Sequence, residues 1–414
     1  MNQDLITIGK RAQIAANKLA LMNTATKNKA LLQLADDLIK NKNQIIAANQ
    51  QDLAAATQMP TKFTDRLMVN SQRIADMANG LRTIADLNDP TSQIDKGWIT
   101  KDGLQILQRR VPLGVIGIIF EARPNVTVDA TGLTFKSGNA VILRGGKEAI
   151  QTNTALVKIL RESLKKQHLP VDAVQLITDT SHAIADEMMN LTDYIDVLIP
   201  RGGRALIQRV VTTATVPVIE TGAGNCHVYI DKDADLTMAT NITVNAKVQR
   251  PSVCNAAEKL LIHRDIAAEF LPVIARALME HGVQLRGDET ACQLVSTIRP
   301  VTEEDWDTEY NDLIMAVKIV DSLDDAISHI NHYSTHHSES IITNNITRGR
   351  YFQQAINSAC VYVNASTRFT DGGEFGFGAE IGISTQKLHA RGPMGLQQLT
   401  TIKYEITGNG QIRK

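Results

Sequence analysis

Aromatic residues account for only 4% of this 414-residue chain, which also has just four cysteines and no long uninterrupted apolar run. The strongest apolar stretch, Val111 to Phe120, is interrupted by Pro112, Gly114 and Gly117. A bilayer-spanning helix needs about 20 consecutive apolar residues, so this stretch cannot cross a membrane. The N-terminus lacks the apolar segment of a signal peptide, and four scattered cysteines fit a reducing compartment. The sequence therefore predicts a cytoplasmic protein that is not embedded in a membrane.

Neither sign of charge is in excess, because 43 Lys and Arg stand against 44 Asp and Glu, for a formal net charge of -1. A chain with this balance has no general attraction for a nucleic-acid backbone or an anionic membrane surface. Hydrophobic residues make up 43% of the sequence, which argues against disorder. At roughly 150 residues per domain, the length predicts two or three domains with sizeable cores.

The first part of the chain, from Thr7 to about Leu87, has leucines and isoleucines at three-to-four spacing between polar residues. This pattern predicts three or four packed amphipathic helices. The stretch from Trp98 to Arg110 then alternates around Asp102-Gly103, a pair that favours a hairpin turn. We therefore expect a helical region followed by a β-hairpin.

After this hairpin, short apolar runs recur, most of them separated by segments long enough for a helix. A first series lies at Val115 to Phe120, Ala140 to Leu143, Val174 to Ile177, Val197 to Ile199 and Val216 to Ile219, and a second at Val228 to Ile230, Lys259 to Ile262, Val317 to Val320 and Ser340 to Thr343. Apolar strands alternating with helices are typical of parallel sheets covered on both faces, so we expect two successive α/β lobes. The last strand, Leu399 to Ile406, is expected to pair with the Trp98–Arg110 hairpin or with another subunit.

Two of the apolar strands run into Gly-Gly pairs flanked by cations, Arg144-Gly145-Gly146-Lys147 and Arg201-Gly202-Gly203-Arg204. Glycines let backbone N–H groups approach an anion, and a following helix N-terminus adds partial positive charge. Neither segment has the full G-x-G-x-x-G dinucleotide fingerprint, so tight strand-to-helix turns are the alternative interpretation. If a dinucleotide binds, Arg144 and Lys147 favour NADP, because a 2′-phosphate requires a cation where NAD sites offer a carboxylate.

Cys254 is the candidate nucleophile among the four cysteines. It follows Arg250-Pro251-Ser252-Val253, where a Pro-Ser turn is expected to lead into a short helical stretch. A helix N-terminus lowers the pKa of a thiol, and Arg250 could help to hold the thiolate. The alternative is a small buried hydrophobic residue, which is the commoner role of an unbridged cysteine. For the remaining cysteines, at positions 226, 292 and 360, we expect that structural role.

Four histidines near the C-terminal third, His329, His332, His336 and His337, raise the possibility of a metal site. Tyr333-Ser334-Thr335 is expected to be a loop, so the histidines would not share one helical face. No cysteine or carboxylate with metal-ligand spacing accompanies them. The sequence therefore predicts no metal.

Six further segments carry a family resemblance that runs along the whole chain. They are Phe120-Glu121-Ala122-Arg123-Pro124-Asn125, Lys136-Ser137-Gly138-Asn139, Gln249-Arg250-Pro251-Ser252-Val253-Cys254-Asn255, Val363-Asn364-Ala365-Ser366-Thr367-Arg368-Phe369, Gly373-Glu374-Phe375-Gly376 and His389-Ala390-Arg391-Gly392-Pro393-Met394-Gly395. On these segments the chain closely resembles the gamma-glutamyl phosphate reductase (glutamate-5-semialdehyde dehydrogenase) family of the aldehyde dehydrogenase superfamily. The resemblance implies an aldehyde-dehydrogenase-like fold with two Rossmann-like open parallel-sheet lobes and a small β oligomerisation arm.

The resemblance also implies roles for individual residues. Cys254 resembles the superfamily's catalytic thiol, and Glu220 its upstream glutamate, which activates water in hydrolytic relatives and is expected here to handle protons or to orient substrate. Asn125 is the nearest candidate for the oxyanion-hole amide. Cofactor-binding roles are implied for a larger set, namely Arg144, Gly145, Gly146, Lys147, Arg201, Gly202, Gly203 and Glu309, with Glu309 resembling the glutamate that holds the nicotinamide ribose. Substrate-binding roles are expected for Arg123, Arg250, Ser252, Arg368 and Arg391, because arginines suit carboxylate and phosphate groups.

The implied reaction is NADPH-dependent reduction of L-glutamyl 5-phosphate to L-glutamate 5-semialdehyde and phosphate, the second step of proline biosynthesis. The implied organisation is an NADP-binding domain at 1–97 and 111–225, to which 365–395 returns, a catalytic domain at 226–364 and an oligomerisation arm at 98–110 and 396–414. A homo-oligomer and a transient association with glutamate 5-kinase are the expected partners.

Three alternatives from the sequence stay open at this point. The first is another acyl phosphate or aldehyde oxidoreductase of the same superfamily. The second is a cysteine-dependent acyltransferase or hydrolase that uses no nicotinamide, against which the two Gly-Gly segments argue. The third is a non-catalytic oligomeric protein with the same fold, against which the intact Cys254 argues.

Overall fold

The structure is a computed structural model that describes residues 2–56 and 61–413. The chain divides into two compact units. The first contains Met1–Thr221, Gly376–Gly382 and Met394–Lys414, and the second contains Gly222–Phe375 and Ile383–Pro393. The 365–395 segment, which we expected to return to the first lobe as a whole, is thus shared between the units.

The first unit begins with five helices in the described residues, where we predicted three or four. They are α1 (Gln3–Leu19), α2 (Thr24–Lys40), α3 (Lys42–Ala55), α4 (Thr61–Leu67) and α5 (Ser71–Asp86). Asparagine side chains cap three of these helices, because Asn2, Asn23 and Asn70 each accept a hydrogen bond from a backbone N–H of the first turn. The polar interruptions of the helical pattern are therefore helix ends.

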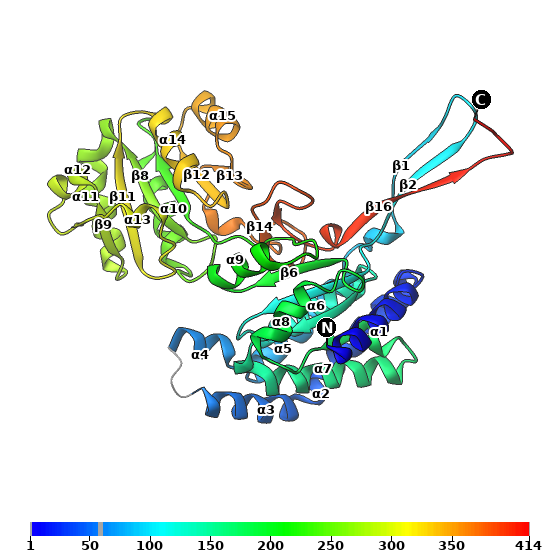
Figure 1. Cartoon of the computed structure of the whole chain (residues 1–414). Coiled ribbons are helices and arrows are strands. Elements are labelled where there is room, and N and C mark those ends of the chain that lie inside the picture. The colour runs from blue at the N-terminus through cyan, green and yellow to red at the C-terminus, as the bar shows by residue number, and fades with distance from the viewer. Residues whose placement is uncertain (1, 57–60, 414) are drawn as a thin grey trace. The chain divides into compact units, whose positions relative to one another are not determined.

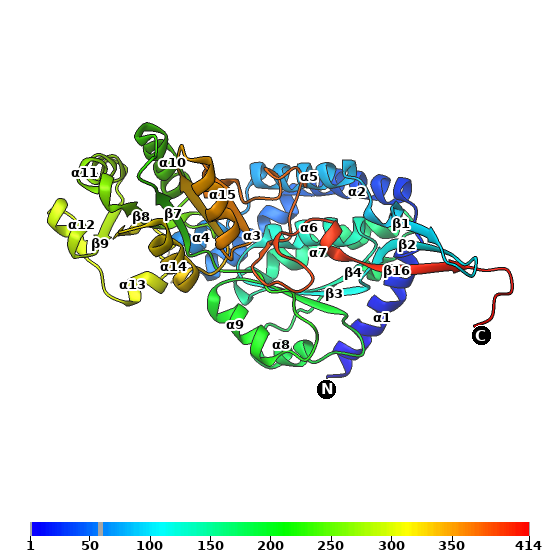
Figure 2. The same cartoon turned by 90° about the horizontal axis from the view of Figure 1, so that it is seen from above.

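A four-stranded parallel sheet in the order β5-β4-β3-β6 forms the centre of the first unit. Its strands are β3 (Val115–Phe120), β4 (Ala140–Arg144), β5 (Val174–Leu176) and β6 (Val197–Arg201), and its helices are α6 (Pro124–Lys136), α7 (Ile150–Lys166), α8 (His182–Met189) and α9 (Arg204–Thr213). Helices α6 and α7 cover one face of the sheet, with α2 and α5 outside them, whereas α1, α8 and α9 lie on the other face (Figure 2). The predicted strand at Val216 to Ile219 forms only an isolated bridge between Leu198 and Val218.

A separate three-stranded antiparallel sheet also belongs to the first unit (Figure 1). Its strands are β1 (Ile94–Ile99), β2 (Gln105–Pro112) and β16 (Thr400–Thr407), with β2 in the middle. The C-terminal strand therefore pairs with the hairpin, as the sequence predicted. Gly103 adopts a positive φ of 81° in the hairpin loop. Side chains of this sheet, among them Ile99 and Ile406, are exposed.

The second unit contains a seven-stranded parallel sheet in the order β10-β9-β11-β8-β7-β12-β13. The strands are β7 (Cys226–Ile230), β8 (Ala257–His263), β9 (Gln284–Gly287), β10 (Arg299–Pro300), β11 (Ile314–Val320), β12 (Ser338–Ile342) and β13 (Cys360–Val363). The helices are α10 (Leu236–Val248), α11 (Arg264–Glu280), α12 (Glu289–Leu294), α13 (Glu304–Asp307), α14 (Leu323–Tyr333) and α15 (Ile346–Ala355), and a short antiparallel pair is formed by β14 (Ile383–Ser384) and β15 (Gly392–Pro393).

Both faces of this larger sheet are buried, because alternate residues of its strands point to opposite sides. Val228 and Leu260 belong to the core under α10 and α11, whereas the next residues along the strands, Tyr229 and Leu261, belong to the core under α14 and α15. This explains why the strands are continuously apolar in the sequence. The predicted α/β fold with two parallel sheets and a small antiparallel sheet is confirmed.

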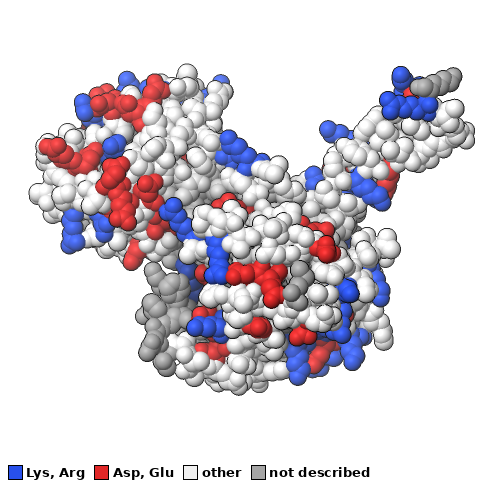
Figure 3. All heavy atoms as spheres, in the orientation of Figure 1, with Lys and Arg blue, Asp and Glu red and all other residues white. Residues whose placement is uncertain are grey.

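The surface agrees with the balanced composition, since basic and acidic side chains are both present on the visible face of each unit (Figure 3). Among the helices in the described part of the chain, none combines the length and apolar character needed to cross a bilayer.

Candidate active site and nucleotide-binding loops

Cys254 lies half-buried in the turn between α10 and β8 of the second unit. The chain leaves this turn directly into a strand, Ala257–His263. The predicted helix after Cys254 is therefore wrong: only two residues separate the thiol from the buried strand, too few for a helical turn. Stabilisation of a thiolate here cannot come from a helix N-terminus and has to come from neighbouring donors and cations.

On one side, the Cys254 turn contacts the start of β7. A Cβ atom added to Gly224 would overlap the carbonyl group of Cys254, so only glycine fits. The Cys226 thiol donates a hydrogen bond to the same carbonyl oxygen, with 3.2 Å between Sγ and O. Burial raises the pKa of Cys226 well above its ordinary value, which keeps this thiol protonated as a donor.

On the other side, the turn is bound to residues 366–370. The Asn255 side chain donates to the carbonyl oxygen of Thr370 at 2.8 Å, and the Thr367 hydroxyl donates to the Asn255 carbonyl at 2.7 Å. Arg368 donates through Nη1 to Asn255 Oδ1 and through Nε to Gln249 Oε1 at 2.8 Å. The guanidinium group therefore bridges the two ends of the segment that contains Cys254.

The predicted substrate residues Arg250 and Ser252 lie in this same segment. Arg250 is exposed, and Ser252 is half-buried. Burial lowers the pKa of Arg368, and the positive charge of Arg250 lowers it further. Two cations thus lie close to the thiol segment. Arg391 is bound elsewhere in the unit, because its Nη2 donates to the carbonyl and side-chain oxygens of Asn357 at 3.0 and 3.1 Å.

Glu309 lies in the loop between α13 and β11, also within the second unit. Its Oε1 accepts a hydrogen bond from the backbone N–H of Gly224 at 2.7 Å. The carboxylate thus contacts the residue that packs against Cys254. In the sequence, Gly222-Ala223-Gly224 is only a lone G-x-G pattern, which is too weak a signal to predict the contact between Gly224 and Glu309.

In the first unit, the two Gly-Gly segments follow β4 and β6 at the carboxyl edge of the sheet. Arg144 is buried, and its Nη2 donates to the carbonyl oxygens of Thr180 and Ser181 at 2.5 and 3.0 Å. Burial lowers its pKa. Gly145 and Gly146 are buried, whereas Lys147 is exposed. Arg144 is thus committed to the loop before α8, and Lys147 is the more accessible of the two cations.

The second segment, Arg201-Gly202-Gly203, leads into the N-terminus of α9. The carboxylate of Glu121, which follows β3, accepts a hydrogen bond from the Gly203 N–H at 3.0 Å. A Cβ atom on Gly202 would lie 2.7 Å from the Glu121 carboxyl carbon, so a larger residue there would push the Glu121 side chain aside. The N-terminus of α9 therefore already holds an anionic group.

The other predicted residues of the first unit lie near the carboxyl edge of its sheet. Arg123 is half-buried and precedes α6, and Asn125 is exposed in its first turn, where its amide donates to Asp129 Oδ2 at 3.0 Å. Burial raises the pKa of Asp129 to about 6. Glu220 is half-buried, and burial raises its pKa as well. A carboxyl group with a raised pKa can exchange protons nearer to neutral pH.

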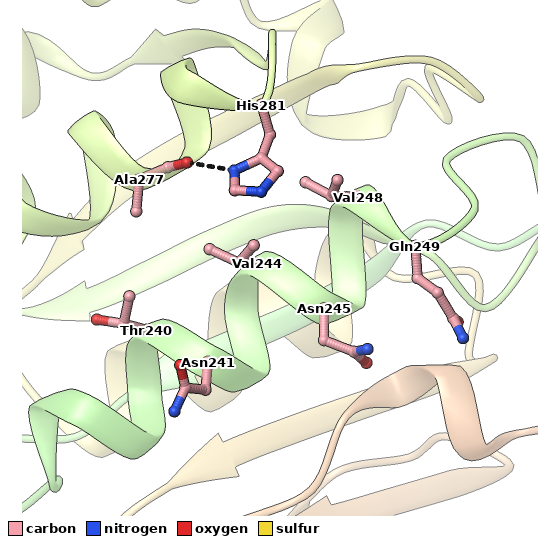
Figure 4. Close-up of a pocket in the computed structure, with 8 residues that line it drawn as sticks. All are labelled: Thr240, Asn241, Val244, Asn245, Val248, Gln249, Ala277 and His281. Carbon is pink, nitrogen blue, oxygen red and sulfur yellow. Dashed lines mark hydrogen bonds between the residues drawn. The ribbon is translucent and has the colours of Figure 1, made fainter.

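A surface groove of about 430 Å³ lies between α10 and α11 in the second unit (Figure 4). Its lining residues are Thr240, Asn241, Val244, Asn245, Val248, Gln249, Ala277 and His281. None of these side chains is a lysine, an arginine or a carboxylate. The groove therefore lacks the cations that a phosphorylated, dicarboxylic substrate would require.

The four histidines are not gathered into one group of potential metal ligands. His329 is buried in α14, where burial lowers its pKa to about 2, and burial lowers that of His337 to about 4. Helix α14 includes Tyr333, one residue of the predicted loop, and ends there, so that Ser334 and Thr335 lie outside the helix. Across the residues that the structure describes, no three His, Cys, Asp or Glu side chains are placed to hold a metal ion.

Comparison with known proteins identifies the family to which this fold and site belong. Residues 2–301 match the family model described as the aldehyde dehydrogenase family, which uses nicotinamide cofactors. An acetylating aldehyde dehydrogenase from Geobacillus thermoglucosidasius has the same fold, with a TM-score of 0.73 at 16% identity over 100% of this chain and 98% of that one.

Closer relatives share one description. A gamma-glutamyl phosphate reductase of Limosilactobacillus reuteri is 98% identical over 100% of both chains, and one of Lactiplantibacillus plantarum is 61% identical over 99% of each. The crystal structure of a gamma-glutamyl phosphate reductase from Thermotoga maritima matches with a TM-score of 0.97 at 48% identity, over 100% of both chains. The chain therefore belongs to the aldehyde dehydrogenase family and, within it, to the gamma-glutamyl phosphate reductases.

Proposed function

We propose that this chain reduces L-glutamyl 5-phosphate to L-glutamate 5-semialdehyde and phosphate, using NADPH and a thioester on Cys254. The activity makes it an oxidoreductase of the aldehyde group in proline biosynthesis, in keeping with relatives of 98% and 61% identity. The single structural observation that supports the covalent step is the Cys254 turn, bound on both sides and flanked by Arg250 and Arg368. Such an arrangement preorganises a nucleophile.

The covalent step requires little from other groups, because phosphate is a good leaving group. The Cys254 thiolate attacks the acyl carbon, the carbon–oxygen bond to phosphate breaks, and phosphate leaves with the electron pair. Backbone N–H donors of the turn, such as that of Cys254, and the Asn125 side chain are the candidates to stabilise the oxyanion. NADPH, when bound, supplies the hydride that reduces the acyl group to the aldehyde and returns the thiolate.

The predicted substrate-binding arginines differ in the hydrogen bonds that they already make within the chain. Arg250 is exposed and lies in the same segment as Cys254, so we assign it to the phosphate, together with Ser252. Arg368 and Arg391 are hydrogen-bonded within the chain, so part of each guanidinium group is used in holding structure. We assign Arg368 chiefly to the Cys254 turn and retain Arg123 and Arg391 as candidates for the substrate carboxylates. Glu220, with its raised pKa, is the candidate for proton transfer or substrate orientation.

The cofactor site is proposed at the carboxyl edge of the first unit's sheet. In open parallel sheets, nucleotides bind beyond the carboxyl ends of the strands, where the strand order reverses, which here lies between β3 and β6. Gly145, Gly146, Gly202 and Gly203 flank this position, and the Glu121 carboxylate on the Gly203 N–H supports an anion site there. Lys147 is the cation proposed to select NADP.

Assembly is part of the same proposal. The antiparallel sheet of β1, β2 and β16 exposes Trp98, Ile99, Tyr404 and Ile406, and burial of such a surface favours a homo-oligomer. Association with glutamate 5-kinase and a cytoplasmic location stay predictions from the sequence.

The reverse reaction tests the function directly. Purified protein is supplied with glutamate semialdehyde, phosphate and NADP, and NADPH formation is followed by absorbance. We expect phosphate-dependent reduction that Cys254→Ala abolishes and that Cys292→Ala, at another half-buried thiol, retains. Undiminished activity in Cys254→Ala would contradict the thioester route. Acyl transfer to Cys254 without any binding of NADPH would instead support an acyltransferase.

A further inference from the structure

The backbone of the nucleophile segment is fixed by a bend at residues 222–226. The Cys254 carbonyl lies between Gly224, which has no room for a Cβ atom, and the Cys226 thiol, which donates to it at 3.2 Å. A shift of this bend would therefore move the carbonyl group of the nucleophile. Because the carbonyl and the side chain belong to one residue, such a shift would also reorient the Cys254 thiol.

The bend is in turn bound to the segments 306–309 and 333–335. Glu309 accepts from the Gly224 N–H at 2.7 Å. The neighbouring Asn225 is buried, and its amide donates to the carbonyl oxygens of Trp306 and Tyr333, both at 2.8 Å. The Asn225 N–H donates to the Thr335 hydroxyl at 2.9 Å. Of these contacts, only that of Glu309 is made to Gly224, the residue that packs on Cys254.

The loop that contains Glu309 is held by two residues at the start of β8, four and five positions after Cys254. Lys259 donates to the Thr308 carbonyl at 2.7 Å, and Glu258 accepts from the Asn311 N–H at 3.2 Å. Glu258 is fixed by a buried ion pair with Lys247 at 2.9 Å. The contacts therefore close a ring, from Cys254 along the start of β8 to the Glu309 loop, and from Glu309 through Gly224 back to Cys254.

We propose that Glu309 is a positioning residue for the nucleophile, which holds the 222–226 bend against Cys254 through the Gly224 N–H. This inference rests on the proposed role of Cys254 and adds a cofactor-independent role to the ribose contact expected for Glu309. A carboxylate that served only the cofactor would influence the thiol only when the cofactor is bound. A positioning residue influences the thiol in the protein alone.

Alkylation of Cys254 by iodoacetamide, without cofactor or substrate, separates the two roles. The adduct is followed by peptide mass spectrometry, which resolves Cys254 from the other three thiols. Glu309→Gln keeps an oxygen acceptor for the Gly224 N–H, whereas Glu309→Ala removes it, and both lack the charge. We expect Cys254 in Glu309→Ala to react about fivefold more slowly than in Glu309→Gln, the effect of one ordinary hydrogen bond. Glu304→Ala, at an exposed glutamate of α13, is the matched control and should react like wild type.

A second pair of variants, at Cys226, tests the 222–226 bend at its C-terminal end. This test does not require that the Glu309→Ala variant folds. Cys226→Ser keeps a donor for the Cys254 carbonyl, and Cys226→Ala removes it, so Cys254 should again react more slowly in the alanine variant. At saturating NADP, the reverse-reaction kcat should fall in both alanine variants and recover largely in Glu309→Gln and Cys226→Ser. Equal alkylation rates within either pair overturn the proposal, even if the KM for NADP changes. Because alkylation needs neither NADP nor acyl phosphate, its outcome is independent of whether the proposed reaction is correct.

Discussion

The carboxylate of Glu121 accepts a hydrogen bond from the backbone N–H of Gly203, with 3.0 Å between the two atoms. It therefore occupies a donor at the N-terminus of α9 that the proposed cofactor pyrophosphate would use. We expect Glu121→Ala to tighten NADPH binding roughly two- to fivefold, because a carboxylate at a helix N-terminus contributes about 0.3–1 kcal/mol. Titration of intrinsic or NADPH fluorescence gives the Kd. Glu162→Gln, at an exposed glutamate of α7, is the control, and weaker binding in Glu121→Ala would show that the carboxylate supports the cofactor.

Lys147 and Arg144 differ in what their replacement should change. Lys147 is exposed after the Gly-Gly turn, so Lys147→Glu should lower kcat/KM for NADPH at least about tenfold relative to NADH with little loss of stability. Arg144→Met should instead lower the melting temperature, because buried Arg144 donates to the Thr180 and Ser181 carbonyl oxygens. Steady-state kinetics with both cofactors and a thermal melt separate these effects. An unchanged NADPH/NADH preference in Lys147→Glu would remove this residue from the cofactor site.

The buried carboxyl group of Glu339 makes the free energy of unfolding depend on pH. It lies in β12, accepting from the His227 N–H at 2.7 Å and the Ser358 hydroxyl at 3.1 Å, and burial raises its pKa from 4.5 to about 8. The folded state thus binds the proton more tightly than the unfolded state. Its stabilising contribution is complete below pH 4.5 and is lost as the pH rises toward 8.

Glu339→Gln cannot ionise and should flatten this dependence. Because one pKa unit corresponds to about 1.4 kcal/mol, the wild-type free energy of unfolding should fall by at least about 1 kcal/mol more than that of the variant between pH 5 and 8. Urea unfolding at several pH values measures the difference. Glu304→Gln, at an exposed glutamate of the same unit, should retain the wild-type slope. If the free energy of unfolding changed with pH equally in Glu339→Gln and in wild type, the pKa of Glu339 would be the same in the folded and unfolded states.

The sequence was sufficient for the fold because its apolar runs form strands buried on both faces, as with Tyr229 and Val228 on opposite sides of β7. Pairing of the C-terminal strand with β2 was also predictable, since an unpaired strand exposes its hydrogen-bonding edge. The prediction of a strand at Val216 to Ile219 was wrong, because apolar character alone does not distinguish a strand from a buried connection.

The surroundings of Cys254 were less predictable. The Pro-Ser turn suggested a helix start, whereas the buried strand β8 begins two residues after the thiol. The contacts of Gly224 with Cys254 and Glu309 join residues 30 and 85 positions apart, and no local pattern encodes them. The Gly222-Ala223-Gly224 pattern is visible in the sequence. The steric requirement for glycine at position 224 appears only when the chain is folded.

Variants of Arg250 and Arg368 should distinguish substrate binding from positioning of the Cys254 turn. Exposed Arg250 is assigned to phosphate, so Arg250→Gln should raise the KM for phosphate in the reverse reaction about tenfold or more, as expected for loss of a charge-assisted contact. Arg368 bridges Gln249 and Asn255 through two separate nitrogens, Nε and Nη1, a spacing that the single nitrogen of a lysine does not reproduce.

Arg368→Lys should therefore lower kcat more than it raises the KM for phosphate. Arg350→Lys, at an exposed arginine of α15, serves as the control and should leave both constants unchanged. Initial rates over a range of phosphate concentrations give the two constants for each variant. A rise in KM alone for Arg368→Lys would assign this guanidinium group to the phosphate instead. An effect of Arg250→Gln on kcat alone would exchange the two assignments and make Arg250 the positioning residue.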